Sequence, residues 1–100
     1  MTSQIERPTT TAVYAGSFDP ITNGHLDVIR RATNIFGHVH IAVAAHTSDP
    51  KKRGALFSVE ERVEMIQENI VDVAERVTVD SFTGLLVDYC DAVGARVNIR

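Results

Sequence analysis

A short polar stretch near the start of the chain, Thr22-Asn23-Gly24-His25, carries groups that could do chemistry. It follows the loop sequence Gly16-Ser17-Phe18-Asp19-Pro20, which offers a glycine, a hydroxyl and free backbone N–H groups. Hydroxyl and imidazole groups donate hydrogen bonds to phosphate, and a glycine lets an anion approach the backbone. The stretch is neither a Walker loop, because no Gly-Lys-Ser/Thr follows, nor a GxGxxG fingerprint.

The elements on either side of this loop decide whether its groups can act together. Residues 11–15 have the composition of a strand, and residues 26–36 form an amphipathic pattern typical of a helix. A strand–loop–helix junction directs backbone N–H groups and the positive end of a helix dipole at one point, which favours phosphate binding. The same residue types are ordinary turn formers, so a plain turn between strand and helix is the alternative.

Strand and helix patterns alternate along the rest of the chain. Residues 39–45 are almost all apolar, as in a strand buried on both faces, and residues 58–70 begin with a capping box. The order βαβαβαβ is completed by strands at 77–80 and 96–99 and a helix at 85–93. This order predicts a parallel sheet with right-handed crossovers, in which the long loop 46–57 follows a strand at the edge where ligands bind.

Length and composition limit the classes of protein to which the chain can belong. The 100 residues predict one domain, which we take as residues 11–100 after a flexible leader at 1–10. A net charge of −3 argues against nucleic-acid binding, so an anionic substrate needs the basic run Lys51-Lys52-Arg53. The single Cys90, without a long apolar run or a signal peptide, favours a cytoplasmic protein with no membrane partner.

The loop sequence at residues 16–25 resembles the signature of the T/HxGH nucleotidyltransferase superfamily and, within it, the bacterial phosphopantetheine adenylyltransferase family. Further stretches are similar to that family in the same order. Lys51-Lys52 and residues 56–62 resemble its lysine loop and the helix after it, and residues 81–89 and 96–100 continue the likeness. The resemblance covers roughly residues 11–100 and favours phosphate binding over a plain turn.

The resemblance implies a fold and a reaction. The fold is a Rossmann-like α/β sheet with helices on both faces and the first four strands in the order 3-2-1-4. The reaction moves AMP from ATP to 4′-phosphopantetheine, gives dephospho-coenzyme A and pyrophosphate, and uses Mg²⁺. The family forms hexamers, and coenzyme A is a candidate feedback ligand. The alternatives are another nucleotidyltransferase of the superfamily, such as a nicotinamide mononucleotide adenylyltransferase or a cytidylyltransferase, and a non-catalytic fragment that binds phosphate or nucleotide.

Four site residues follow from the same resemblance. His25 is expected to bind ATP and to stabilise the transition state by donating a hydrogen bond to the α-phosphate. Ser17 is expected to bridge the phosphates of both substrates through its hydroxyl, and Phe18 to bind ATP through its backbone N–H. Lys51 is expected to bind the phosphate of phosphopantetheine, with Lys52 as the alternative. The structural readings are a helix cap for His25 and a turn hydroxyl for Ser17.

Leu86 and Arg100 complete the expected substrate site. Leu86 aligns with a family position along the pantetheine arm, although a leucine at helical spacing is as often part of the core. Arg100 aligns with the first arginine of a segment that binds the substrate phosphate. The family continues to ~160 residues, so we expect the domain to be truncated at its carboxyl end. No side chain is assigned to a metal, His38 and His40 are interpreted as structural, and Asp19 as a turn residue.

Overall fold

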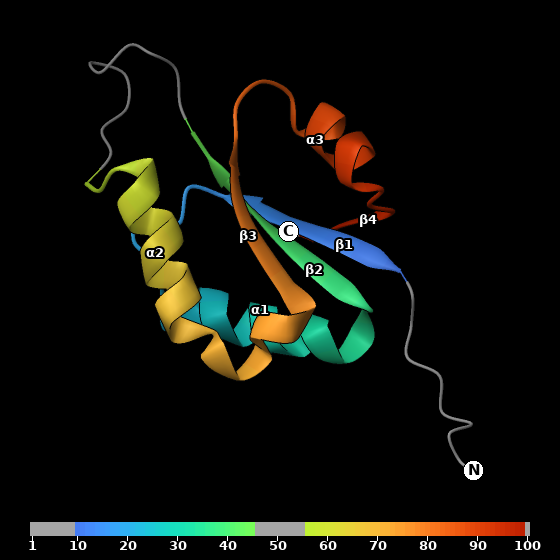
Figure 1. Cartoon of the computed structure of the whole chain (residues 1–100), viewed down its shortest axis with the longest axis horizontal. Helices are drawn as coiled ribbons and strands as arrows, with labels where there is room; N and C mark the ends of the chain where they lie inside the picture. Colours follow the sequence, from blue (N-terminus) through green and yellow to red (C-terminus); the bar gives the residue numbers. More distant parts are fainter. Residues whose placement is uncertain (1–9, 46–55, 100) are drawn as a thin grey trace.

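The computed structural model describes residues 10–45 and 56–99, in which strands and helices alternate (Figure 1). In chain order the elements, where η2 is a 3-10 helix, are β1 (Thr11–Gly16), α1 (Asn23–Ile35), β2 (His38–Ala44), α2 (Val59–Asn69), η2 (Val71–Arg76), β3 (Val77–Phe82), α3 (Leu86–Val93) and β4 (Val97–Ile99). The strands form one parallel sheet with the order β3-β2-β1-β4. The predicted Rossmann-like fold and its strand order are confirmed.

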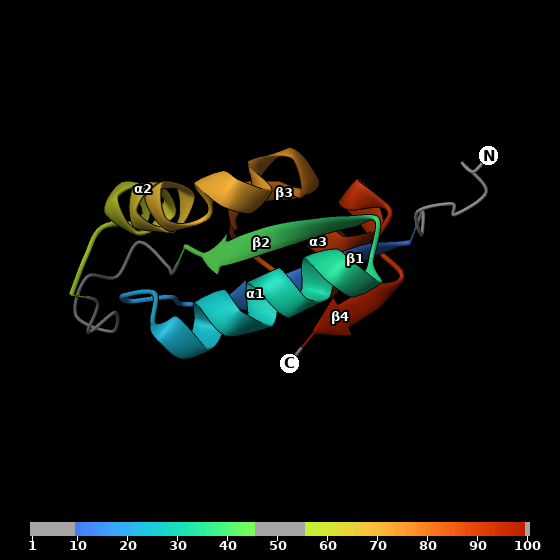
Figure 2. The ribbon, with the colours of Figure 1, turned by 90° about the horizontal axis from the view of Figure 1, so that it is seen from below.

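Helices cover both faces of the sheet, as predicted. Helices α1 and α2 lie on one face and α3 lies on the other (Figures 1 and 2). Successive residues of a strand point to opposite faces, and every second residue of β2 (Val39, Ile41 and Val43) belongs to the buried core cluster. Ile29 of α1 and Ile66 of α2, both fully buried, belong to the same cluster. The main core therefore lies between the sheet and the layer of α1 and α2.

Helices α1 and α2 each begin at a reciprocal cap. Ser58 accepts a hydrogen bond from the backbone of Glu61, whose carboxylate accepts one from the backbone of Ser58, so α2 begins as predicted. Helix α1 begins at Asn23, three residues before the predicted start, because Thr22 and His25 form the same kind of cap. The 3-10 helix η2, which lies between α2 and β3, is not predicted by the sequence pattern.

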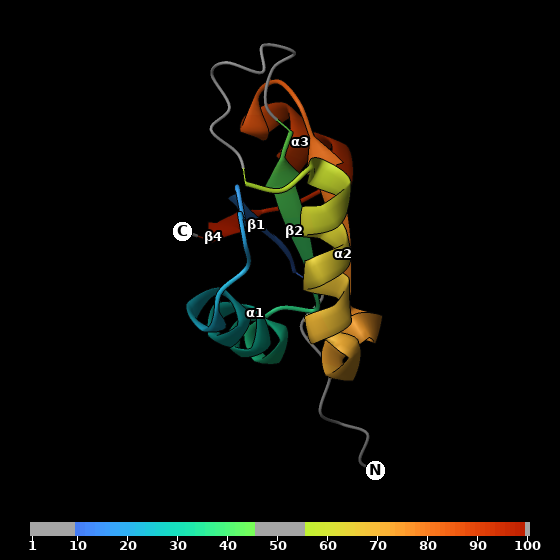
Figure 3. The ribbon, with the colours of Figure 1, turned by 90° about the vertical axis from the view of Figure 1, so that its left-hand side faces the viewer.

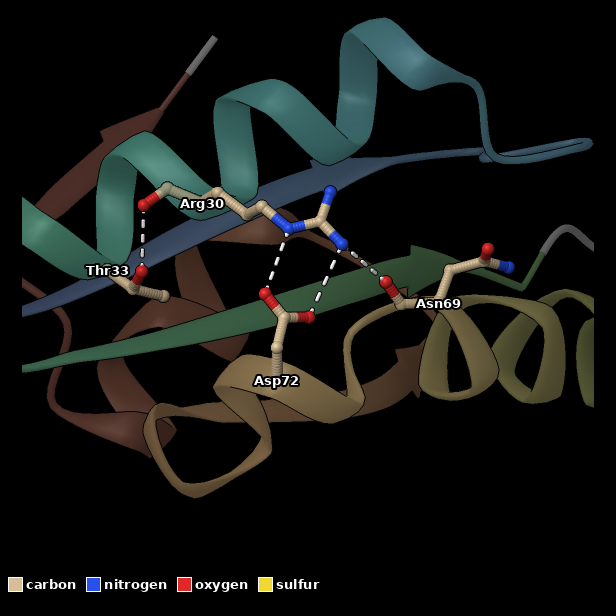
Figure 4. Close-up of polar contacts among 4 residues, drawn as sticks. All are labelled: Arg30, Thr33, Asn69 and Asp72. Atoms are coloured by element: carbon tan, nitrogen blue, oxygen red, sulfur yellow. Dashed lines mark hydrogen bonds and ion pairs between the residues drawn. The ribbon is translucent and has the colours of Figure 1, made fainter.

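An arginine on α1 ties that helix to η2 (Figure 4). Arg30 donates to both carboxylate oxygens of Asp72, at 3.1 and 3.3 Å, and to the backbone carbonyl of Asn69 at 2.9 Å. This hydrogen bonding is the main cause that lowers the pKa of Asp72 and raises that of Arg30. Both side chains are about half exposed, so the pair contributes little to stability. Arg30 differs in this exposure from Arg62 of α2, which is buried.

The face of the sheet under α3 is more polar. The ring of His38 lies 2.7 Å from the hydroxyl of Thr78 on β3, measured from Nε2. The neighbouring His40 packs edge-on against Tyr89 of α3, but its buried Nδ1 and the Tyr89 hydroxyl have no partner among the described residues. Burial raises the pKa of Tyr89 to about 12, with the charge of Asp80 as a further cause. Both histidines thus lie in the sheet, as their structural interpretation requires.

His40 is expected to make stability depend on pH. Burial is the main cause that lowers its pKa from 6.5; the nearby His38 lowers it further, and Asp80 opposes the shift. The unfolded chain therefore takes up this proton at a higher pH than the folded chain, and the free energy of unfolding should fall as the pH drops from about 7 to about 5. Urea unfolding at several pH values tests this, and the loss should be smaller in His40→Val. An unchanged pH dependence in that variant would contradict the assignment to His40.

Candidate functional site

The loop between β1 and α1 contains a strained residue. Phe18 has a φ of 49°, in the left-handed region that side chains other than glycine rarely adopt. Its ring is almost fully buried, with its centroid 5.3 Å from that of Tyr14 and 5.0 Å from that of His25. Such strain costs about 1–3 kcal/mol and persists only where the surrounding packing determines the conformation, which is common at functional sites. The buried ring therefore fixes the backbone of this loop.

Gly16 makes that packing possible. A Cβ atom at this position would lie 3.3 Å from Cζ of the Phe18 ring, which is tighter than an ordinary contact. The sequence predicts a glycine that admits a phosphate to the backbone. In the structure the side of Gly16 on which a Cβ would lie is filled by the phenyl ring of Phe18, so Gly16 shapes the loop through this packing.

The two ring nitrogens of His25 differ in their surroundings. The backbone N–H of Thr22 donates to Nδ1 at 3.0 Å, and the Thr22 hydroxyl accepts from the backbone N–H of His25 at 3.2 Å. Because Nδ1 accepts a hydrogen bond, the proton of the neutral ring resides on Nε2. No described residue bonds to Nε2, so the ring offers this N–H to a ligand. The structural reading of His25 as a cap and its functional reading as a donor are therefore compatible.

The start of α1 has the electrostatic character that an anion requires. Helix α1 has thirteen residues, and its first turn contains no acidic side chain that would offset the positive end of the dipole. The Ser17 hydroxyl is exposed on the preceding loop, and His25 is half-buried in the first turn. Ser17, Phe18 and His25 thus lie within one loop and the helix turn after it, the arrangement predicted for a phosphate site.

Two side chains whose long-range contacts the sequence does not predict hold this loop against the start of α2. Asp19 accepts the backbone N–H groups of Leu56 and Phe57 at 2.7 and 2.9 Å, so it does more than form a turn. Arg62, on α2, donates to the carbonyl of Ser17 at 2.8 Å. Figure 3 shows the loop and the start of α2 side by side. The signal for Arg62 was its helical spacing, since it shares the inward face of α2 with Ile66.

Comparison with known proteins identifies the family of the chain. A family model described as "Cytidylyltransferase-like" matches residues 13–99 of the chain. The chain belongs to the cytidylyltransferase-like family. The matched range includes the β1–α1 loop, both capped helices and all the strands from β1 to β4 except the first residues of β1.

Curated relatives of this cytidylyltransferase-like chain carry a more specific name. The chain is 49% identical over 89 residues to the phosphopantetheine adenylyltransferase of Syntrophotalea carbinolica, and the match covers 89% of this chain and 51% of that protein. It is 51% identical over 89 residues to the phosphopantetheine adenylyltransferase of two Leptospira biflexa strains, covering 89% of this chain and 52% of those proteins. The chain therefore spans about half the length of the curated relatives that it matches.

A solved structure supports the cytidylyltransferase-like fold. A bifunctional NMN adenylyltransferase/ADP ribose pyrophosphatase from Francisella tularensis, complexed with AMP and a manganese ion, matches with a TM-score of 0.59 and 26% identity. The match covers 85% of this chain and 25% of that one. Both the family model and this structure therefore support the Rossmann-like α/β fold of the chain.

Of the remaining predicted site residues, the structure describes only Leu86. Lys51, Lys52 and Arg100 lie outside the described residues. Leu86 is half-buried and lines a groove of about 430 Å³ between α3 and β4, together with Val97 and other residues of those elements. Leu86 is therefore neither a fully buried core residue nor a member of the β1–α1 loop cluster.

Two features are absent from the part of the chain that the structure describes. Residues 10–45 and 56–99 contain no group of three histidine, cysteine or acidic side chains that could hold a metal ion. Within the same ranges, every helix is too short or too polar to cross a membrane. A side-chain cage for Mg²⁺ is therefore not formed by these residues.

Proposed function

We propose that this chain carries the adenylyl-transfer site of a phosphopantetheine adenylyltransferase. The chain is about 50% identical to curated enzymes of that name but only 26% identical to the NMN adenylyltransferase. This difference favours phosphopantetheine as the acceptor substrate. The observation that carries the proposal is His25, whose Nδ1 accepts the helix cap and whose Nε2–H remains available at the amino-terminal end of α1. A helix cap uses only Nδ1 of the His25 ring. It does not require a free Nε2–H beside the strained loop at Phe18.

The reaction that fits this arrangement is an in-line transfer. A phosphate oxygen of 4′-phosphopantetheine attacks the α-phosphorus of ATP, and the bond from that phosphorus to the bridging oxygen of the β-phosphate breaks. Dephospho-coenzyme A forms and pyrophosphate leaves. This chemistry needs positioning and charge stabilisation more than proton transfer. In the proposal His25 donates from Nε2 to the α-phosphate, Ser17 and the N–H of Phe18 orient the phosphates, and Lys51 binds the acceptor phosphate.

Fewer observations support the proposed metal and the further ligands. Manganese and AMP in the Francisella tularensis structure support divalent-metal use with nucleotides in this family. The described residues do not fit a resident Mg²⁺, so in our proposal the ion is bound mainly by nucleotide phosphates and water, as is common for Mg²⁺. Assembly into hexamers, feedback by coenzyme A, a cytoplasmic location, and the assignments of Leu86 and Arg100 rest on the family resemblance.

Calorimetry with the 100-residue chain tests the proposal. Separate titrations use ATP, dephospho-coenzyme A and, as a competing acceptor, nicotinamide mononucleotide. We expect binding of ATP and dephospho-coenzyme A but not of nicotinamide mononucleotide. Binding of ATP alone would support a nucleotide site without the proposed acceptor. Tighter binding of nicotinamide mononucleotide than of dephospho-coenzyme A would indicate that nicotinamide mononucleotide is the acceptor instead. Absence of binding by all three ligands would contradict a phosphate site in this loop.

Lys51→Ala is expected to weaken dephospho-coenzyme A binding more than ATP binding. The reason is that its charge is assigned to the acceptor phosphate, and one contact to a charged group is worth about tenfold in affinity. Lys52→Ala is the matched control, because it removes the same charge one residue away. Calorimetry with both ligands measures the difference. Equal losses for the two ligands, or a larger effect from Lys52→Ala, would show that the acceptor phosphate is bound elsewhere.

A further inference from the structure

Arg62 is a buried cation that, among the described residues, bonds only to backbone carbonyls. It is 2% exposed, although it lies on α2 next to the loop just described. Its Nη1 donates to the carbonyls of Ser17 at 2.8 Å and Ala44 at 3.2 Å. Its Nε donates to the carbonyls of Phe57 at 3.2 Å and Ser58 at 3.4 Å. One guanidinium therefore joins the β1–α1 loop, the end of β2 and the start of α2.

The hydrogen bonds of this buried arginine require acceptors in fixed directions. Removing a guanidinium from water is costly, and its planar set of donors offsets that cost only when acceptors lie in the right directions. Lysine carries the same charge but lacks the rigid fork. The positions of the accepting carbonyls of Ser17, Ala44 and Phe57 are therefore coupled through one rigid group.

Asp19 strengthens this coupling at the same residue, Phe57, through the neighbouring peptide. It accepts the N–H of Phe57, whose carbonyl accepts from Arg62. Ser17 and Asp19, two residues apart on the loop, are thus tied to Phe57, one through Arg62 and the other directly. The residue between them is Phe18, which holds the strained backbone conformation.

The bond to the Ser17 carbonyl determines where the next N–H points. The carbonyl of Ser17 and the N–H of Phe18 belong to one planar trans peptide, in which the two groups point in opposite directions. Because Arg62 holds the carbonyl toward α2, the N–H of Phe18 points away from α2. That N–H is the backbone donor assigned to the nucleotide phosphates.

We propose that Arg62 is a positioning residue of the phosphate site, which orients the Ser17–Phe18 peptide so that its N–H faces the bound phosphate. This inference rests on the proposed function, because it requires an anion at the β1–α1 loop. It goes beyond that function in assigning the orientation of the donor to a side chain on another helix.

The first test uses the unmodified chain and inorganic pyrophosphate as the probe. In ¹⁵N-labelled protein the Phe18 amide signal and the Arg62 Nε–H signal are followed during the titration. Both are expected to shift with the same dissociation constant, whereas the Nε–H signal of Arg30 stays unchanged. A shifting Phe18 signal with an unmoved Arg62 signal would overturn this inference alone. No shift at Phe18 or His25 would contradict the phosphate site itself, and this inference with it.

The second test compares substitutions at two arginines. Arg62→Met is expected to weaken pyrophosphate binding by about tenfold or more, since bonds to a charged donor are lost, and Arg62→Lys to recover part of the loss. Arg30→Met is the matched control, because Arg30 also bonds to a carbonyl but ties α1 to η2 (Figure 4). It should change pyrophosphate affinity by less than about twofold.

The two variants separate positioning from a purely structural effect. Unfolding midpoints and the amide exchange of the core residue Ile41 show whether each variant stays folded. A folded Arg62→Met chain with unchanged pyrophosphate affinity, or with no more loss than Arg30→Met, would overturn the proposal. If Arg62→Met does not fold, Arg62→Lys and the side-chain signal of the unmodified chain still decide the question.

Discussion

Replacing His25 with alanine is expected to lower kcat for adenylyl transfer by ~100-fold or more, as the loss of a transition-state donor does. The measurement needs a chain extended to the length of its curated relatives, for which the second half of the Leptospira biflexa enzyme is a suitable addition. ATP affinity should stay nearly unchanged, because the donor acts on charge that develops during transfer. Ser17→Ala should lower both kcat and ATP affinity, because its hydroxyl is assigned to the ground-state phosphates as well.

A control must separate the ring's donor from its function as a cap. Thr22→Ala removes the hydroxyl that accepts from the backbone of His25 but keeps the imidazole. It should cost about 1 kcal/mol of stability, typical of a lost amino-terminal cap, and affect kcat far less than His25→Ala. Pyrophosphate release and thermal unfolding give the two quantities. Near-normal turnover in His25→Ala, or an equal loss of kcat in Thr22→Ala, would contradict the assigned role.

Ile66→Ala is expected to lower the free energy of unfolding by about 2–5 kcal/mol. Ile66 is fully buried between α2 and the sheet, so its truncation leaves a cavity in the main core. Val63→Ala, one turn earlier on the same helix, is the control. Val63 is only half-buried and should cost about 1 kcal/mol or less. Urea unfolding of the 100-residue chain measures both, and equal costs would contradict the placement of Ile66 in the core.

Local patterns were sufficient to predict most elements of the fold. The strand at β2 follows from an apolar run, and the start of α2 follows from Ser58 and Glu61, because both signals arise from neighbouring residues. The start of α1 was placed too late. Thr22 and His25 form a cap there, but histidine replaces the usual glutamate or glutamine at the third helical position. The 3-10 helix η2 was missed because its residues show no helical periodicity.

The candidate site divides in the same way. Ser17, Phe18 and His25 could be grouped from sequence because they are close along the chain. The functions of Asp19 and Arg62 could not, because their partners in the loop and in α2 lie far away in sequence: Arg62 and Ser17 are 45 residues apart, and Asp19 and Phe57 are 38 apart. Sequence spacing can show that Arg62 faces inward, but only the folded chain shows which carbonyls it meets.

The weak attachment of α3 divides the molecule into parts of unequal stability. No residue of α3 is fully buried, its first residue follows Leu85, which provides no side-chain cap, and Leu85 and Val87 are 66% and 59% exposed. Helix α3 contributes no buried side chain, whereas α1 and α2 contribute Ile29 and Ile66 to the core, so we expect α3 and the short strand β4 to open at a lower free energy than global unfolding. The β1–α1 loop, α1 and α2 belong to the part that we expect to stay closed. Opening of α3 and β4 is therefore expected to occur much more often than loss of the geometry around His25.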